Sequence, residues 1–259
     1  MADSLAGELA GLALAAGEGR RLRPLTLLRP KPLCPVGDRA LLDWALDALG
    51  GAVAGIAVNL HHGADAIEAH LARRAEVVGG EVHRSPEPAE ALGTAGAVAR
   101  LRGWLDGRGV LIVNADTWHR ADLAAFASGW DGERVRLLSD TPLPFGPRSG
   151  VVASILPWRL AQQLAERPSG LWECVWRDEL ESGRLDAVHE AGQVIDCGTP
   201  GAYLRANLAW SGGRSVLGEG SVVEGRVERS VVWPGGHVHH GEVLVDAIRT
   251  DTRTTVFVR

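Results

Sequence analysis

The sequence predicts an α/β protein with a doubly wound, mainly parallel but mixed sheet, followed by a short tail of the left-handed β-helix type. Two observations lead to this prediction. Short apolar runs alternate with helical patterns of roughly ten residues along the first half of the chain. From Val216 onward, valine or isoleucine recurs every five or six positions, with glycine and charged residues between.

The individual elements of the first half follow from their apolar patterns. Residues 11–16, GLALAA, form a short apolar run that ends at a glycine, as a buried strand does when it enters a loop. Residues 40–49 place their leucines on one helical face, and Gly50 and Gly51 end that helix. The strands are predicted at 11–16, 55–60, 81–85 and 109–116, and the helices at 40–49, 65–74 and 94–105. This alternation predicts right-handed βαβ units and a parallel sheet. The proline- and glycine-rich residues 140–150 are expected to form a loop.

The tail differs in character from the rest of the chain. The recurring apolar residues have spacings of 6, 5, 5, 6, 5 and 5, which is typical of β-helix coils, although a pair of ordinary β-hairpins is the alternative. They fall at 216, 222, 227, 232, 238, 243 and 248. We therefore expect one α/β domain over residues 1–210 and a β-helix-like appendage over residues 211–259.

Composition and charge exclude several classes of function. The 259 residues carry a net charge of -5 without a basic stripe, so no nucleic-acid partner is expected. No apolar run approaches the roughly 20 residues that span a bilayer, and the acidic N-terminus does not resemble a signal peptide. The three cysteines are far apart in the chain, which indicates a reducing cytoplasm and no disulfide framework.

A glycine-rich loop follows the first predicted strand. Gly17-Glu18-Gly19 leads directly into arginines, and backbone N–H groups of such a loop can cradle an anion. The spacing is not that of a dinucleotide fingerprint, because Leu22 stands where the third glycine would fall, and no P-loop follows. On the glycines alone, a tight strand-to-helix turn is an equal alternative.

Longer motifs identify a family resemblance. Residues 14–26, LAAGEGRRLRPLT, and residues 30–36, PKPLCPV, resemble the signature of the sugar-1-phosphate nucleotidylyltransferases. LGTAGAV at 92–98, LIVNADTW at 111–118 and VIDCGTPGAYLRAN at 194–207 are similar in the same order. The resemblance covers most of residues 11–207 and implies a Rossmann-like nucleotidyltransferase fold. Family members join an NTP to a sugar 1-phosphate and release pyrophosphate.

The resemblance implies roles for particular residues. Arg21 and Lys31 would act on the phosphates as catalytic residues, and Asp116 and Asp196 would hold Mg²⁺ or Mn²⁺. The other implied site residues fall into two groups. Those near the nucleotide are Leu14, Ala15, Ala16, Gly17, Gly19, Leu92 and Gly93, and those near the sugar phosphate are Asn114, Gly150, Glu173 and Arg177.

The residue chemistry supports some of these roles more than others. Lys31 is the only lysine in the chain, and a compact ammonium fits a crowded phosphate site that a planar guanidinium does not. Asp116 ends a predicted strand, where α/β sheets bind ligands, although a lone aspartate is more often a cap or turn residue. Ala115 stands where relatives have glycine.

Other candidates have weaker support from their residue chemistry. For Glu173, a solvent-exposed carboxylate without a ligand is as good an interpretation as a sugar-binding residue. The histidines at 61–62, 237, 239 and 240 lack a third ligand at a metal-site spacing, which favours polar loops.

The predicted function is therefore condensation of an NTP with a sugar 1-phosphate to an NDP-sugar, in the cytoplasm. GTP ranks above UTP and dTTP, because LGTAG resembles guanylyltransferases acting on mannose or heptose 1-phosphate. NADTW and the chain length resemble uridylyltransferases acting on N-acetylmuramic acid 1-phosphate. The alternatives are a cytidylyltransferase for a phospho-alcohol and a non-catalytic, nucleotide-sugar-sensing relative. The repeating valines of the tail also suit a homodimer.

Overall fold

The computed structural model describes residues 9–78, 80–252 and 254–258. Spatial contacts group these residues into two compact units. The first unit holds the described residues up to Gly17, together with Trp44–Ala115 and His119–Val194. The second holds Glu18–Asp43, Asp116–Trp118 and the described residues from Ile195 onward.

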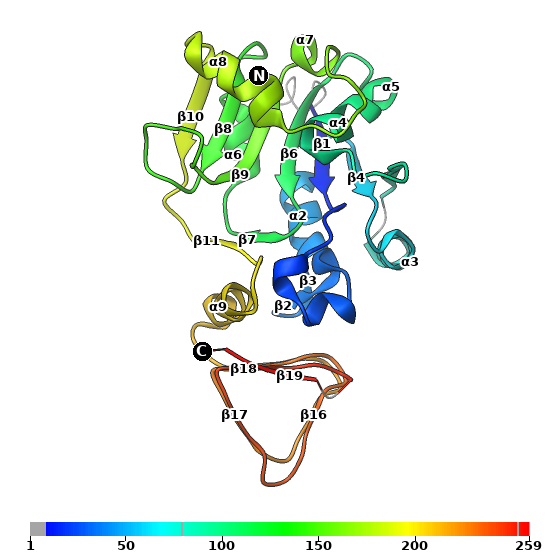
Figure 1. Ribbon diagram of the computed structural model, residues 1–259, viewed down its shortest axis with the longest axis vertical. Helices are drawn as coiled ribbons and strands as arrows, with labels where there is room; N and C mark the ends of the chain where they lie inside the picture. The colour runs from blue at the N-terminus through cyan, green and yellow to red at the C-terminus, as the bar shows by residue number, and fades with distance from the viewer. Residues whose placement is uncertain (1–8, 79, 253, 259) are drawn as a thin grey trace. The chain divides into compact units, whose positions relative to one another are not determined.

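A seven-stranded mixed sheet forms the centre of the first unit (Figure 1). Its order is β10-β8-β9-β6-β1-β4-β5. Strand β9 runs antiparallel to both of its neighbours, and the other described pairs are parallel. This confirms the predicted mixed, mainly parallel sheet. The strands are β1 (Leu9–Leu14), β4 (Ile56–Leu60), β5 (Val82–Pro86), β6 (Gly109–Asn114), β8 (Val135–Ser139), β9 (Val151–Leu156) and β10 (Leu185–His189).

Helices join these strands and cover their apolar side chains. Leu12 and Ile112 of the central strands pack in one buried cluster with Val98 of helix α4. The predicted helix over 94–105 divides near Leu101 into α4 and α5, and the predicted strand over 109–116 ends at Asn114. The helices are α2 (Leu41–Gly50), α3 (Ala64–Val78), α4 (Gly93–Arg100), α5 (Arg102–Leu105), α6 (Leu123–Ser128), α7 (Trp158–Ala161) and α8 (Arg177–Glu181), and η4 (Trp172–Trp176) is a π-helical turn.

The second unit begins with three short 3₁₀ turns, which carry the arginine- and proline-rich motif. Helix α9 (Pro200–Ser211) starts as the sequence favours, because the Thr199 side chain accepts a hydrogen bond from the N–H of Ala202 and proline follows the cap. No described helix combines the length and apolar character needed to cross a membrane. The other elements are η1 (Arg20–Leu22), η2 (Leu25–Leu27), η3 (Lys31–Leu33), β2 (Pro35–Val36), β3 (Arg39–Ala40), β7 (Thr117–His119) and β11 (Val194–Asp196).

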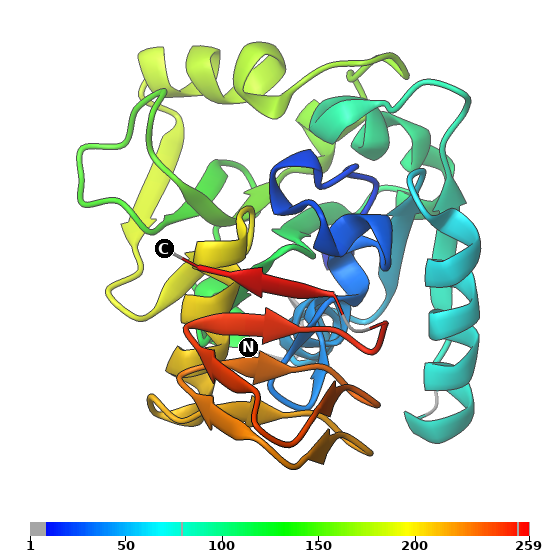
Figure 2. The ribbon, with the colours of Figure 1, turned by 60° about the horizontal axis from the view of Figure 1, so that its bottom comes forward.

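The tail is a coil of short strands. The pairs β12–β15, β15–β18, β13–β16 and β14–β17 are all parallel, which a pair of hairpins would not give. These strands form the sides of a triangle in Figure 1, and Figure 2 shows successive turns, from orange to red, side by side. The strands are β12 (Val216–Leu217), β13 (Val222–Val223), β14 (Arg226–Glu228), β15 (Val231–Val232), β16 (His237–Val238), β17 (Val243–Val245), β18 (Ala247–Arg249) and β19 (Thr255–Phe257).

Two of the recurring tail valines face outward. Val222 and Val243 are 50% and 53% exposed, and their neighbours Val223 and Leu244 pack on the interior instead. Because side chains of a strand alternate between its faces, a shift of one residue exchanges inside for outside. The left hand of the coil and a domain boundary at residue 210 stay predictions.

Candidate active site

Lys31 lies between two carboxylates of the second unit. Its Nζ atom donates hydrogen bonds to Oδ2 of Asp116 at 2.8 Å and to Oδ1 of Asp196 at 3.0 Å. The lysine side chain is only 6% exposed, whereas those of the two aspartates are 38% and 55% exposed. Burial alone would lower the pKa of Lys31, but the two carboxylates outweigh it, so the pKa is raised and the ammonium stays charged.

The motif residues around Lys31 explain its placement. Gly19 has φ +66°, and an added Cβ would lie 2.9 Å from Thr26 and 3.0 Å from Lys31. The Thr26 hydroxyl donates to the carbonyl of Gly19 at 3.0 Å and so fastens the glycine loop to the following turns. A side chain at position 19 would therefore be strained and would push against the Lys31 stem.

Helix α9 holds the other side of the lysine segment. Asn207 is fully buried, and its Oδ1 accepts a hydrogen bond from the N–H of Gly37 at 3.0 Å. The Tyr203 hydroxyl donates to the carbonyl of Pro35 and accepts from Trp233 Nε1 at 3.0 Å. The segment PKPLCPVG is thus fixed at Pro35 and Gly37 by side chains that the motif itself does not contain.

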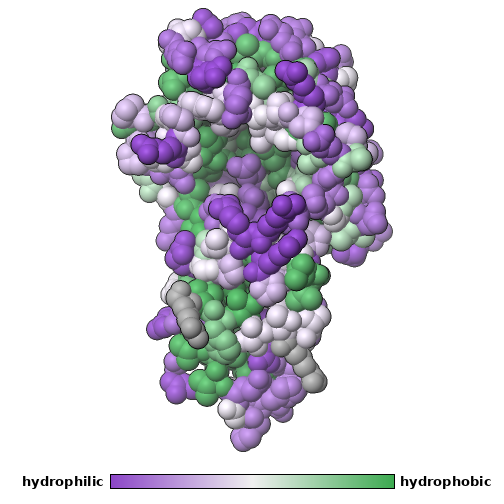
Figure 3. All heavy atoms as spheres, in the orientation of Figure 1, coloured by the Kyte–Doolittle hydropathy of each residue, from purple (hydrophilic) through white to green (hydrophobic). Residues whose placement is uncertain are grey.

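Arg21 approaches the same cluster from the exposed side. Its Nη2 atom lies 3.4 Å from Oδ2 of Asp196, and its side chain is 73% exposed. An ion pair this exposed contributes little to stability, so the guanidinium is free to meet a ligand. Hydrophilic side chains gather over η1 in Figure 3.

A pocket in the first unit contains several of the predicted sugar-site residues. It has a volume of about 330 Å³, and Leu14, Asn114 and Glu173 line it. Gly150 lies between two further lining residues, Ser149 and Val151. Arg177 does not line this pocket, and its Nε donates to the adjacent Asp178 at 3.0 Å. The structure therefore brings three of the four predicted residues to or beside one pocket.

The predicted nucleoside loops are joined by two side chains that sequence reasoning missed. The N–H of Ala15 donates to Asn59 Oδ1, Asn59 Nδ2 donates to Glu87 Oε1, and the N–H of Leu92 donates to Glu87 Oε2, each at 2.7 Å. Asn59 is only 2% exposed. The signal was present in residues 58–62, VNLHH, because an asparagine at the end of an apolar strand needs buried partners.

The turn at 92–96 contains small residues because another segment of the backbone packs closely against it. Gly93 has φ +66°, and an added Cβ there would lie 2.6 Å from the carbonyl oxygen of Ser169. Both backbone groups of Leu92 are engaged, since its carbonyl also accepts from the N–H of Ser169 at 3.0 Å. At Gly17 nothing lies within 4 Å of an added Cβ, which leaves that backbone open. The carbonyl of Ala16 accepts from the N–H of His62 at 3.5 Å.

Ala115, the departure from the family pattern, is fully buried, and its N–H donates to the carbonyl of Leu14 at 3.0 Å. The methyl group of Ala115 thus lies in the interior of the first unit, which explains why alanine is accepted where relatives have glycine.

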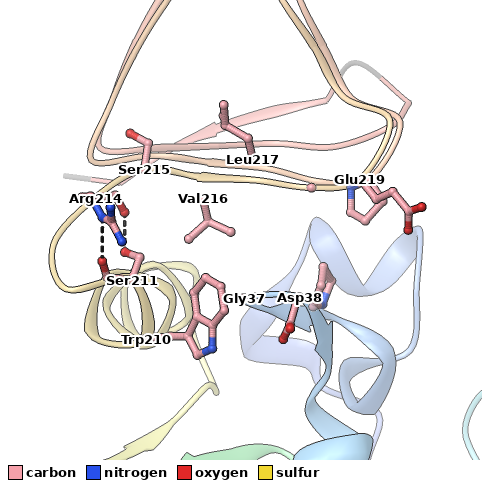
Figure 4. Close-up of a pocket in the computed structure, with 12 residues that line it drawn as sticks. Gly37, Asp38, Trp210, Ser211, Arg214, Ser215, Val216, Leu217 and Glu219 are labelled. Atoms are coloured by element: carbon pink, nitrogen blue, oxygen red, sulfur yellow. Dashed lines mark hydrogen bonds between the residues drawn. The ribbon is translucent and has the colours of Figure 1, made fainter.

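A second pocket, of about 390 Å³, lies in the second unit between α9, the turn at Gly37 and the first tail strands (Figure 4). Figure 4 shows the ring of Trp210 beside Gly37 and the side chain of Val216 turned toward that ring. Arg214 Nε donates to the carbonyl of Ser211 at 3.2 Å. None of the predicted site residues lines this pocket.

Comparison with known proteins identifies the family. The nucleotidyl transferase family model matches residues 10–132. Mannose-1-phosphate guanyltransferase of Neurospora crassa is 32% identical over 267 residues, which cover 91% of this chain and 71% of that protein. The chain belongs to the nucleotidyl transferase family. This confirms the resemblance drawn from its motifs.

Other relatives match over shorter stretches. N-acetylmuramate alpha-1-phosphate uridylyltransferase of Caulobacter vibrioides is 41% identical over 130 residues, or 48% of this chain and 54% of the relative. The Neisseria meningitidis protein of the same name is 37% identical over 122 residues, or 44% of this chain and 49% of the relative. The chain thus spans about half the length of these two family members.

Solved structures share the fold. A putative glucose-1-phosphate thymidylyltransferase from Bacillus anthracis, in complex with a sucrose, superposes with a TM-score of 0.67 at 17% identity. That match covers 78% of this chain and 94% of the other. HddC from Yersinia pseudotuberculosis, complexed with GMP-PN, gives a TM-score of 0.62 at 20% identity, covering 78% and 99%.

Proposed function

We propose that this protein is a sugar-1-phosphate nucleotidylyltransferase, which forms an NDP-sugar and pyrophosphate from an NTP and a sugar 1-phosphate. The observation that carries this proposal is the buried ammonium of Lys31 between two half-exposed carboxylates. A fixed cation beside oxygen ligands suits a reaction that gathers several phosphate charges.

The reaction needs positioning more than covalent chemistry from the protein. An oxygen of the sugar 1-phosphate attacks the α-phosphorus of the NTP, and the bond to the β-phosphate oxygen breaks as the new bond forms. Lys31 is held ready by Asp116 and Asp196, so its charge can meet the phosphates without reorganisation. Arg21, exposed beside Asp196, would add a second positive charge.

Asp116 and Asp196 fit a divalent ion. Both carboxylates converge on one point, because each contacts the same Nζ atom, and both keep exposed surface. Mg²⁺ prefers oxygen ligands and often takes only one or two carboxylates, with phosphate oxygens completing its shell. When bound, Mg²⁺ or Mn²⁺ would neutralise phosphate charge here.

The remaining site residues also have proposed roles. The backbone of Leu14–Gly17, and that of Gly19, would hold the nucleotide phosphates and nucleoside, with Leu92 and Gly93 on the side of the base. Asn114, Gly150 and Glu173 would bind the sugar phosphate. Arg177 is a weaker candidate, because it pairs with Asp178 outside the pocket.

GTP is the proposed first substrate, and UTP is the second candidate. The guanyltransferase of Neurospora crassa aligns with 91% of this chain, which supports GTP. UTP is kept because the uridylyltransferase of Caulobacter vibrioides has the higher identity, 41%, over its shorter match. A pocket that hydrogen-bonds one base edge rejects bases that leave its groups unpaired, so one base should dominate.

A matrix of NTPs against sugar 1-phosphates, read by product mass, tests the proposal. We expect one NDP-sugar with equimolar pyrophosphate, and a GDP-sugar ahead of a UDP-sugar. Phosphocholine with CTP belongs in the matrix, since turnover there alone would favour the cytidylyltransferase alternative. Nucleotide-sugar binding without any product would instead mark a non-catalytic relative.

We also propose a cytoplasmic protein that forms a homodimer through its tail. The tail carries exposed apolar side chains that would suit such a contact, among them Leu217 at 53% and Phe257 at 61% exposure. Analytical ultracentrifugation of the wild type tests this assembly, and a monomer at all concentrations would contradict it.

A further inference from the structure

Three potential metal ligands meet on the outside of the tail, apart from the lysine cluster. They are Glu224, His237 and His239, and their ligand atoms all lie within 4.8 Å of one another. His237 Nε2 lies 3.0 Å from Glu224 Oε2, and the two imidazole ring centres are 3.8 Å apart. Such a close group of two imidazoles and one carboxylate is absent from the other described residues.

The coil itself produces this arrangement. His237 and His239 are two positions apart on the strand β16 and its continuation, so they share its outer face, while Val238 between them is fully buried. Strand β13 pairs with β16 in parallel, with Val223 opposite Val238, and the N–H of Glu224 donates to the carbonyl of Val238 at 2.8 Å. Glu224 therefore stands on the neighbouring turn of the coil, facing the same two histidines.

The ligand set matches zinc rather than magnesium. Imidazole nitrogen suits Zn²⁺, and two histidines with one glutamate are a known three-ligand zinc set that leaves a fourth position for water. The ligand atoms of a tetrahedral Zn²⁺ site are about 3.3 Å apart. Side-chain rotations that move the ligand atoms by about 1 Å would therefore bring them to bonding distance of one ion. A bound ion would replace the direct contact between His237 Nε2 and Glu224 Oε2.

The surrounding charges allow a cation. Arg249 lies nearby, with Nη1 donating to the carbonyl of His237, but its Nη2 lies 2.7 Å from Oε1 of Glu242. That carboxylate neutralises the guanidinium, and the pKa of Glu242 is lowered to about 2, chiefly by its hydrogen bond from Arg249. The negative charge of Glu224 is thus not cancelled by Arg249.

We propose that Glu224, His237 and His239 form a transition-metal site of the Zn²⁺ class that links two successive turns of the tail. The ion would join positions 13 residues apart in sequence, as a clip on the outer face of the coil. The proposal is independent of the transferase reaction, because no residue of the proposed active site takes part in it.

Calorimetric titration of the untagged full-length protein with Zn²⁺, with Mg²⁺ in large excess to occupy carboxylate sites, tests this site. We expect one Zn²⁺ per chain in the wild type and at least about tenfold weaker binding in His237→Asn and His239→Asn. Glu224→Gln should weaken binding as well. Titration with Co²⁺ should give visible absorption bands of a low-coordinate site that vanish in the histidine variants.

The matched control is His240→Asn, an exposed histidine next to the cluster but outside it. It should bind Zn²⁺ as the wild type does, and circular dichroism should show all variants folded, since the substituted side chains lie on the surface. An unchanged isotherm in the double variant His237→Asn/His239→Asn would overturn the proposal. Equal loss in His240→Asn would overturn it too, because binding would then be a general property of surface histidines.

Discussion

The ammonium of Lys31 lies 2.8 Å from Oδ2 of Asp116, although the two residues are 85 positions apart in the chain. The contact joins the proline-rich motif at residues 30–36 to the motif LIVNADTW at residues 111–118. The charged side chain of each motif is therefore held in place by the other motif. A buried lysine with this partner is expensive to desolvate but stays ionised, which is the state that a phosphate site needs.

Lys31→Arg should lower kcat/KM by at least about tenfold while the protein stays folded. The guanidinium keeps the charge but is a wide planar fork, and the lysine side chain that it replaces is only 6% exposed, so its nitrogens cannot occupy the same point. Loss of one fixed charge stabiliser costs about 10²–10³ in rate, so Lys31→Met should lie in that range. Steady-state pyrophosphate release measures both.

The control is Arg73→Lys, which makes the reverse exchange of arginine for lysine at an exposed position of α3. It should leave turnover unchanged. Wild-type kcat/KM in Lys31→Arg would mean that the single lysine of the chain has no catalytic significance.

Asp116→Asn and Asp196→Asn should each remove most of kcat, by about a hundredfold or more, without unfolding the protein. Each substitution removes an anionic oxygen ligand for Mg²⁺ while the other aspartate still neutralises Lys31. The wild type should lose turnover in excess EDTA and regain it with Mg²⁺ or Mn²⁺. Asp38→Asn, whose side chain is 60% exposed beside Arg39, is the matched control. Full turnover in EDTA would remove the metal from the proposal.

Glu87→Gln should raise KM for the NTP by about tenfold, with a smaller effect on kcat. Both oxygens of Glu87 accept hydrogen bonds, from Asn59 Nδ2 and from the N–H of Leu92. Glutamine would turn an NH₂ group toward one of these donors and leave a buried group unpaired, at a cost of about 1–3 kcal/mol. The loop at Leu92 would then lose its fixed position beside the base.

Glu90→Gln makes the same chemical change at an exposed position three residues away and should have no effect on KM. If KM is unchanged in Glu87→Gln, the link between the two loops is structural only.

Most of the sheet could be predicted because its strands are local patterns. The apolar runs at β1, β4 and β6 and the helix α2 each lie within two residues of their predicted bounds, since burial on both faces leaves a continuous apolar run. The antiparallel strand β9 was not predicted, because strand direction depends on pairing between distant segments and leaves no local signal.

The candidate site also has a part that could be predicted from the sequence and a part that could not. The motifs predicted the residue types that meet at Lys31, but the bridge through Asn59 and Glu87 joins segments 28 positions apart that share no recognisable spacing. The recurring apolar positions of the tail likewise do not show which residues face inward, and Val222 and Val243 are exposed. Each has an apolar neighbour, Val223 or Leu244, and only the coil geometry decides which of the two faces inward.

The tail should matter for the stability of the lysine segment, and Tyr203→Phe tests how. The Tyr203 hydroxyl is fully buried, donates to Pro35 and accepts from Trp233 of the tail. Removal of the hydroxyl leaves the indole N–H of Trp233 and the carbonyl of Pro35 without this hydrogen-bond partner. The free energy of unfolding should therefore fall by about 1–3 kcal/mol. Urea denaturation measures this loss, and Tyr203→Phe should retain turnover at temperatures where it is folded.

Truncation after Asn207 should give a larger loss of stability than Tyr203→Phe, because it also removes Trp210, whose ring lies against Gly37. Any truncated protein that still folds should keep measurable turnover, because all the predicted site residues precede residue 208. Retained stability within about 0.5 kcal/mol of the wild type would show that the contacts of Trp233 and Trp210 contribute nothing. A truncated protein that folds but has lost all turnover would instead mean that the tail contributes to the site, at least by holding the Lys31 segment in position.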